Sequence, residues 1–207
     1  MLLMGPSTYF DSGDEEGNKW AREEEISSSL VSVPIGHHYL ILYSSLEVMR
    51  KVYSKYIKVQ IENAPNSVIA LLPYYDSTDK VRELLESMGI KVKENERRGT
   101  LIIVDIENVI TNPYFKGPDI ERLRQFTKEL ENKHNDKTIF VVADMSVFHH
   151  VKKASELLEY ERTLHKDLKV EKWKELCFYN ERDFDIMFTK KQTEELLAYH
   201  KDRVITI

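Results

Sequence analysis

The chain has 207 residues, enough for one well-buried α/β domain with an extension but few for two domains. Its 30 lysine and arginine residues are interspersed among 35 aspartate and glutamate residues, which argues against direct binding of nucleic acid. A single cysteine excludes an internal disulfide, and the absence of a signal peptide or of an apolar run of about 20 residues predicts a cytoplasmic protein without a membrane span.

Residues 1–33 differ in composition from the rest of the chain. They combine several glycines, an acidic cluster and the run Ser27 to Ser29, a composition that buries little surface. We expect a polar tail here, with a helical turn around Trp20 to Ile26. Pro34 and Gly36 mark the start of a single folded domain, which we place at residues 34–207.

The first half of this domain alternates strands and helices. A β-rich run at His38 to Tyr43 is followed by an amphipathic helix that Ser44 or Ser45 can cap. The continuous apolar run Val68 to Pro73 predicts a strand that is covered on both faces. A second amphipathic helix follows it and ends at Gly89.

The second half continues this alternation. Up to residue 133, we expect a short strand or turn at Ile90 to Gly99, a strand at Thr100 to Ile106, a loop at Asn112 to Pro118, and a helix at Ile120 to Lys133 capped by Asp119. The next expected elements are a strand at Thr138 to Ala143 and a mostly helical region at Val147 to Leu168. The chain is then expected to form a strand at Glu175 to Tyr179, a helix at Thr189 to Tyr199 and a last strand at Arg203 to Ile207. Strands that alternate with helices imply right-handed crossovers. We therefore expect an α/β three-layer sandwich with a mainly parallel sheet.

Polar and aromatic side chains follow the expected strands at their carboxyl ends. They are Tyr43, Ser44 and Ser45, then Tyr74, Tyr75 and Asp76, then Asp105 and Glu107, then Asp144, Met145 and Ser146, and finally Tyr179 and Asn180. Ligands of such sheets lie beyond the carboxyl ends of the strands, so these residues predict one crevice suited to a small organic molecule with a polar group. The alternative is that the tyrosines only complete the core.

The pattern of a nucleotide-binding enzyme is present only in part. Leu101 to Asp105 has four apolar residues and an aspartate, which in P-loop enzymes places a carboxylate near the magnesium of the nucleotide. The chain has no G-x-x-x-x-G-K-[ST] motif, and the turn after the first strand, Tyr43-Ser44-Ser45-Leu46, contains neither glycine nor lysine. Hydrolysis of ATP is therefore not expected. The alternative is a nucleotide-binding or ATP-hydrolysing enzyme in which Asp105 and Asp144 hold magnesium.

Other reactive side chains carry weaker signals. The pairs His37 with His38 and His149 with His150 could supply metal ligands, but adjacent histidines on a strand point to opposite faces, so no metal site is expected. Cys177 is interpreted as a small buried hydrophobic residue.

Four motifs occur in an order and spacing that resemble a known family. They are Pro34-x-Gly36-x-His38 running into Tyr43, Gly99 followed by Leu101 to Asp105, Leu157-Leu158-Glu159-Tyr160-Glu161, and Cys177-x-Tyr179-x-x-Arg182-x-Phe184. They resemble the MEDS family, a methanogen and methylotroph sensory domain that is found in a dichloromethane-responsive transcriptional regulator and in other signalling proteins. The resemblance runs from about residue 34 to the C-terminus.

The resemblance implies a RecA- or KaiC-like fold that has lost its phosphate loop and binds small hydrocarbon derivatives. The residues that match the family are His38, Tyr43, Asp105, Glu159, Glu161, Cys177 and Tyr179. Asp144-Met145-Ser146 occupies the place of a family Gly-Glu-Met-Ser segment, with Ala143 in place of the glycine. From the residues alone, Glu159 and Glu161 could equally belong to a solvated helix surface.

Together these patterns predict a non-enzymatic sensory domain in signal transduction or transcriptional regulation. We expect a small-molecule ligand, no catalytic residue and no cofactor. We also expect a protein partner in signalling and a homodimer, because a lone sensor must pass its signal on. A third interpretation is an interaction scaffold whose pocket no longer binds a ligand.

Overall fold

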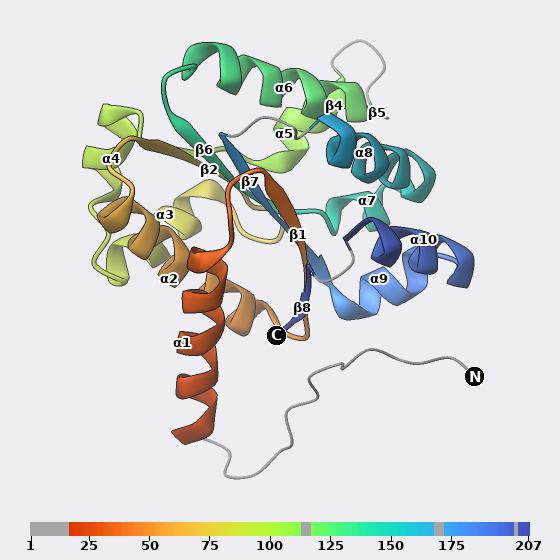
Figure 1. Cartoon of the computed structure of the whole chain (residues 1–207), viewed down its shortest axis with the longest axis horizontal. Coiled ribbons are helices and arrows are strands. Elements are labelled where there is room, and N and C mark those ends of the chain that lie inside the picture. Colours follow the sequence, from red (N-terminus) through yellow and green to blue (C-terminus); the bar gives the residue numbers. More distant parts are fainter. Residues whose placement is uncertain (1–16, 113–116, 168–171, 201–202) are drawn as a thin grey trace.

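A computed structural model describes residues 17–112, 117–167, 172–200 and 203–207. Its centre is a six-stranded sheet in the order β3-β2-β6-β7-β1-β8, in which every pair is parallel. The strands are β1 (His37–Tyr43), β2 (Ser67–Leu72), β3 (Leu101–Ile103), β6 (Thr138–Asp144), β7 (Trp173–Asn180) and β8 (Val204–Thr206). The three-layer α/β fold expected from the alternating pattern is thus confirmed (Figure 1).

Helices cover both faces of the sheet in two groups (Figure 1). The first group is α1 (Gly17–Ser32), α2 (Leu46–Asn63), α3 (Thr78–Ser87) and α4 (Val92–Arg98). The second group is α5 (Ile106–Ile110), α6 (Ile120–Lys133), α7 (Val147–His150), α8 (Ala154–Asp167), α9 (Glu181–Met187) and α10 (Lys190–His200). A two-stranded antiparallel ribbon, β4 (Thr111–Asn112) and β5 (Gly117–Pro118), joins α5 to α6.

Each face of the sheet has its own apolar core. All six residues of β2 are buried, as the continuous apolar run predicted. In β1 the side chains alternate, so that Leu40 packs with the second helix group and Ile41 and Tyr43 pack with the first. Whether a residue of a strand has an even or an odd position, its parity, therefore determines which face of the sheet its side chain joins.

Polar side chains fix where several helices begin. Ser45 accepts a hydrogen bond from the backbone N–H of Val48 at the start of α2, and Asp119 accepts one from Glu121 at the start of α6. Both caps were expected. Asp105 caps α5 in the same way, so that β3 ends earlier than the predicted strand from Thr100 to Ile106.

Two elements differ from the sequence prediction. The segment Ile90 to Gly99, expected as a short strand or turn, contains helix α4, whose Val92 and Asn95 are buried; Gly99 ends it with a φ of 68° that favours glycine. Helix α9, which follows β7 directly, was not predicted. Asn180 caps it and its apolar residue Phe184 packs into the core.

Helix α1 is longer than the predicted helical turn at Trp20 to Ile26. Leu30 near its end is fully buried in the core between α1 and α2, and Ser27 is 1% exposed. The ammonium group of Lys174, from the middle of the sheet, donates hydrogen bonds to the carbonyl oxygens of Leu30 and Val31. The last turns of α1 therefore pack against the sheet and α2, within the range expected as a tail. Residues 1–16 lie outside the described part, and the domain limits stay a prediction.

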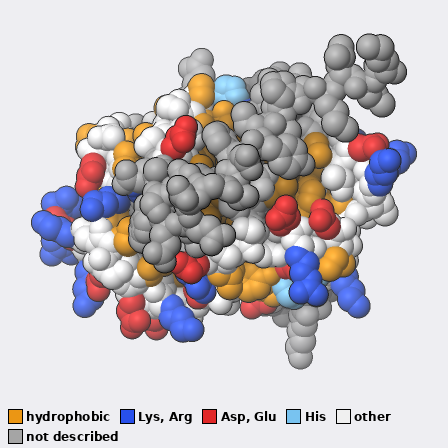
Figure 2. Space-filling view, turned by 90° about the horizontal axis from the view of Figure 1, so that it is seen from below, with side chains coloured by type: hydrophobic (Ala, Val, Ile, Leu, Met, Phe, Trp, Pro, Cys, Tyr) orange, Lys and Arg blue, Asp and Glu red, His pale blue; other side chains and the backbone are white. Residues whose placement is uncertain are grey.

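Charged side chains of both signs are spread over the surface seen in Figure 2. This agrees with their interspersed order in the sequence. Within the described residues, no helix has the length and apolarity needed to cross a membrane.

Candidate functional site

The carboxyl ends of β1, β6 and β7 are tied together by hydrogen bonds. The Tyr43 hydroxyl at the end of β1 lies 3.4 Å from both carboxyl oxygens of Asp144 at the end of β6, and 3.2 Å from the Ser146 hydroxyl. Ser146 donates its backbone N–H to Asp144 and accepts the N–H of Asn180 through its hydroxyl oxygen. These side chains thus fill the space between the ends of the three strands.

Beside this group lies a small apolar cavity, here called the strand-end pocket. Its lining residues are Met49, Tyr53, Leu71, Leu72, Pro73, Tyr74, Tyr75, Asp76, Val142, Asp144 and Phe178. Its volume is about 10 Å³, close to the space of a single water molecule. Any larger ligand must displace one of the side chains around it.

The electrostatics of the pocket are dominated by burial. Burial raises the pKa of Asp144 from its ordinary value of 3.8 to about 7, although the hydrogen bonds with Ser146 and Tyr43 act in the opposite direction. Burial, with the nearby Asp144, also raises the pKa of the Tyr43 hydroxyl well above its usual range. The Asp144 carboxyl therefore gains and loses its proton near neutral pH, and it can donate a hydrogen bond in its protonated form.

A polar rim surrounds the pocket. The Tyr75 hydroxyl donates to Asp183 at 2.5 Å and lies 3.3 Å from His150 Nε2, while His149 and His150 lie 3.8 and 3.6 Å from the Asp183 carboxylate. Burial and Asp183 raise the pKa of Tyr75. Tyr74 and Tyr75, which follow β2 and line the pocket, are in edge-to-face contact with 4.9 Å between their ring centroids.

A bidentate ion pair holds the other side of the rim. Arg50 of α2 donates two hydrogen bonds to Asp76, at 2.7 and 2.8 Å. The arginine is thus already paired with a carboxylate.

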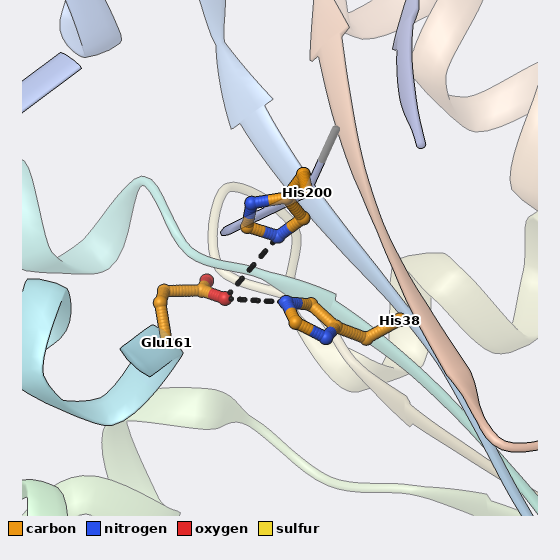
Figure 3. Close-up of side chains that lie close together, drawn as sticks. All are labelled: His38, Glu161 and His200. Carbon is orange, nitrogen blue, oxygen red and sulfur yellow. Dashed lines mark ion pairs between the residues drawn. The ribbon is translucent and has the colours of Figure 1, made fainter. Parts of the chain in front are cut away.

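A second polar group, here called the His–Glu cluster, is buried on the opposite face of the sheet. It consists of His38 of β1, Glu161 of α8 and His200 of α10, whose side chains are 1%, 0% and 0% exposed. Nε2 of His38 lies 3.1 Å from Oε2 of Glu161, and Nε2 of His200 lies 3.5 Å from the same oxygen. Figure 3 shows the two imidazole rings directed at the carboxylate.

The cluster continues along β7, where every second residue faces it. The Tyr179 hydroxyl donates to Oε1 of Glu161, and the Cys177 thiol lies 3.8 Å from Glu175. The Tyr160 hydroxyl donates to Glu175 at 3.3 Å. Two strands, β1 and β7, and two helices, α8 and α10, thus contribute polar groups to one buried region of the core.

Burial and neighbours set the protonation of this region. Burial acts to raise the pKa of Glu161, but contacts with His200 and His38 outweigh it and hold that pKa below its usual range. Burial lowers the pKa of His38, against the effect of Glu161. Burial and the Glu161 charge raise the pKa of Glu175 to about 8 and that of the Cys177 thiol still further. The arrangement is one buried carboxylate facing two imidazoles, beside a neutral glutamic acid.

The predicted site residues fall into these two groups and not into one crevice. Tyr43, Tyr74, Asp76 and Asp144 lie at the strand-end pocket. The family-matched residues His38, Glu161, Cys177 and Tyr179 meet at the His–Glu cluster. The single crevice was wrong because residues of opposite parity on β1 and β7 face opposite sides of the sheet.

Five predicted residues lie in neither group. Ser44 donates to the carbonyl oxygen of Ile207, Ser45 and Asp105 cap helices, Met145 is buried in the core, and Glu159 pairs with Arg162 on the surface.

The strand before Asp105, β3, is at the sheet edge, and three strands separate it from β1. The Asp105 carboxylate, which the alternative enzyme interpretation assigned to magnesium, accepts a hydrogen bond from Glu107 in its own helix α5.

The two histidine pairs do not meet. His38 faces Glu161, whereas His149 and His150 lie beside Asp183. The residue that completes the cluster, His200, gave no signal in the sequence because it is a lone histidine at the end of a helix. Glu175 could have been found, since it has the same parity in β7 as Cys177 and Tyr179.

Comparisons with known proteins agree with this fold. A family model described as the methanogen/methylotroph, DcmR sensory domain, abbreviated MEDS, matches residues 37–201. The structure is similar to the crystal structure of a KaiC-like protein from the hyperthermophilic archaeon Pyrococcus horikoshii OT3, with a TM-score of 0.54 and 14% sequence identity. The match covers 70% of this chain and 61% of that protein, and at this identity it shows the fold alone. No curated protein sequence matches significantly.

Proposed function

Because the chain belongs to the MEDS family of sensory domains, we propose that it is a non-enzymatic sensor whose strand-end pocket binds a small organic ligand. The sensory role follows from the family, and the pocket and the ligand class are our proposal. The fold is that of a KaiC-like protein, so the main competing function is the binding or hydrolysis of a nucleotide.

One observation carries this proposal: the Tyr43 side chain, from the end of β1, reaches the end of β6, where its hydroxyl lies against Asp144 and Ser146. A phosphate loop would need open backbone N–H groups and a lysine at this turn. Ser44 is bonded to Ile207 and Ser45 to the start of α2, and the turn contains no lysine. The turn therefore lacks the lysine that would neutralise a triphosphate.

The lining of the pocket supports a small organic molecule with one polar group. Most of its residues are apolar or aromatic, and Asp144 offers a buried carboxyl whose pKa is raised to about 7. The half-buried Tyr74 and Tyr75 form one wall, and their displacement would open the space. Hydrocarbon derivatives with a hydroxyl, carbonyl or halogen fit this chemistry.

We further propose that the signal passes to a protein partner or to a second copy of the chain in the cytoplasm, in signal transduction or transcriptional regulation. Light scattering with and without a bound compound tests the second copy directly. A monomer under both conditions would leave a separate protein as the recipient.

The binding experiment is a thermal-shift screen of small organic compounds, followed by calorimetric titration of those that stabilise the protein. Two variants should weaken binding by at least about tenfold, Asp144→Asn and Tyr43→Phe, because each removes a polar contact inside a dry pocket. The control is Asp105→Asn, which lies outside the pocket and keeps a good helix cap. Equal loss of affinity in the control, or no stabilising compound in any class, would contradict the proposal.

The same titration with ATP and magnesium tests the competing enzyme. We expect no heat of binding and no release of inorganic phosphate. Phosphate release that the Asp144→Asn change abolishes would establish the nucleotide function instead.

A further inference from the structure

The protonation of His200 is restricted by one hydrogen bond. Its Nδ1 lies 2.8 Å from the carbonyl oxygen of Leu196, and a carbonyl can only accept, so Nδ1 carries the hydrogen. In a neutral ring, Nε2 then presents a lone pair, and this atom faces Oε2 of Glu161 at 3.5 Å. Two acceptors face each other, which requires a positive species between them: either a proton or a metal ion.

The surroundings of Glu161 also indicate that a positive species is needed beside its carboxylate. Among the described residues, no lysine or arginine pairs with its carboxylate, which is fully buried. One oxygen, Oε1, accepts the Tyr179 hydroxyl, and the other is directed only at the two histidines. A buried carboxylate without a matching positive charge is costly, and a divalent ion would offset that cost.

We propose that His38, Glu161 and His200 bind a divalent first-row transition metal, zinc or ferrous iron. Two histidines and one carboxylate form a common donor set for both ions. Donor atoms about 2.1 Å from a tetrahedral zinc ion lie roughly 3.3 to 3.5 Å from one another. The two distances to Glu161 Oε2 are 3.1 and 3.5 Å, and one donor atom of each residue lies within 4.8 Å of the others (Figure 3).

The contacts behind two of these residues, His200 and Glu161, are those that metal ligands commonly have. The second nitrogen of His200 is held by a backbone carbonyl, and the second oxygen of Glu161 by a hydroxyl. The ligands come from β1, α8 and α10, so an ion would tie both helices to the sheet. Three protein donors leave at least one coordination position for a small donor molecule.

The test uses the full chain, stripped of metal with a chelator and titrated calorimetrically with Zn²⁺ and, without oxygen, with Fe²⁺. We expect one ion per chain and an increase in thermal stability. Co²⁺ in place of zinc should give visible absorption bands. His200→Gln should weaken binding by at least about 100-fold, and Tyr179→Phe by about 10- to 100-fold because it frees the carboxylate ligand.

His150→Gln is the matched control, since this histidine is half exposed and lies outside the cluster. It should bind the ion as the wild type does. Wild-type protein that takes up none of the three metals stoichiometrically would overturn the proposal. So would a folded His200→Gln protein with unchanged affinity, which would assign the ion to surface histidines.

If His200→Gln fails to fold, the wild-type Co²⁺ spectrum and the weaker binding of Tyr179→Phe decide the matter. The proposal does not depend on whether the strand-end pocket binds an organic compound.

Discussion

Replacement of Asp144 by asparagine should change how the stability of the protein depends on pH. The native carboxyl has a pKa of about 7 against an ordinary value of 3.8, so between these pH values the folded state keeps a proton that the unfolded state has lost. Stability therefore falls as the pH rises through this window, by about 1.4 kcal/mol per pH unit. Asparagine removes this dependence and can still accept the N–H of Ser146.

The size of this change in stability follows from the pH range between the two pKa values of Asp144. Between about pH 5 and about pH 7, the free energy of unfolding of the wild type should fall by roughly 2 to 3 kcal/mol relative to that of Asp144→Asn. Above that range the difference between the two proteins should stay constant. Urea unfolding followed by tryptophan fluorescence at a series of pH values measures it. The control is Asp185→Asn, which removes an exposed carboxylate and should run parallel to the wild type. A stability difference between Asp144→Asn and the wild type that does not change with pH would refute the reasoning.

Further predictions concern the buried parts of the core. Tyr179→Phe should destabilise the protein by about 1 to 3 kcal/mol, because it leaves a buried oxygen of the Glu161 carboxylate without its donor. The control is Tyr53→Phe, since the Tyr53 hydroxyl has no hydrogen-bond partner among the described residues. This change should be nearly neutral in the same urea assay. Leu30→Ala should lower the free energy of unfolding by about 2 to 5 kcal/mol if α1 is part of the fold. Ile35→Ala, at an exposed position, should lower it by about 0.5 kcal/mol or less. A small effect at Leu30 would restore the interpretation of residues 1–33 as a tail. Cys177 should react with a thiol reagent only in unfolding conditions, because it is buried and its pKa is raised; rapid reaction of the native protein would contradict this.

The sequence predicted the sheet well because its strands are apolar on both faces. A run such as Val68 to Pro73 has the length and composition of a strand covered by two layers, and the alternation of strands with helices predicts a parallel orientation. The segment around α4 misled the prediction because it is short and mostly charged, with Val92 and Asn95 facing inward only once the helix is formed. The segment was too short for its sequence pattern to distinguish a helix from a strand or turn.

The site was predictable residue by residue but not as an arrangement. Parity in β7 places Cys177 and Tyr179 on one face, and the family resemblance indicates Glu161. That this glutamate meets His38 and His200 depends on how α8 and α10 pack on the sheet, and no local pattern encodes this packing. The choice between Glu159 and Glu161 was settled by the same packing, which leaves Glu159 at the surface.

Strand β7 separates the two polar regions by the thickness of one backbone. Phe178 forms part of the pocket wall, while its neighbours Cys177 and Tyr179 project to the other side. Because adjacent residues share a peptide unit, a shift of the backbone at Phe178 also moves the points from which the Cys177 thiol and the Tyr179 phenol project. A ligand that displaced the β7 backbone at the pocket would thereby change the geometry around Glu161 as well, because Tyr179 donates its hydroxyl to that carboxylate.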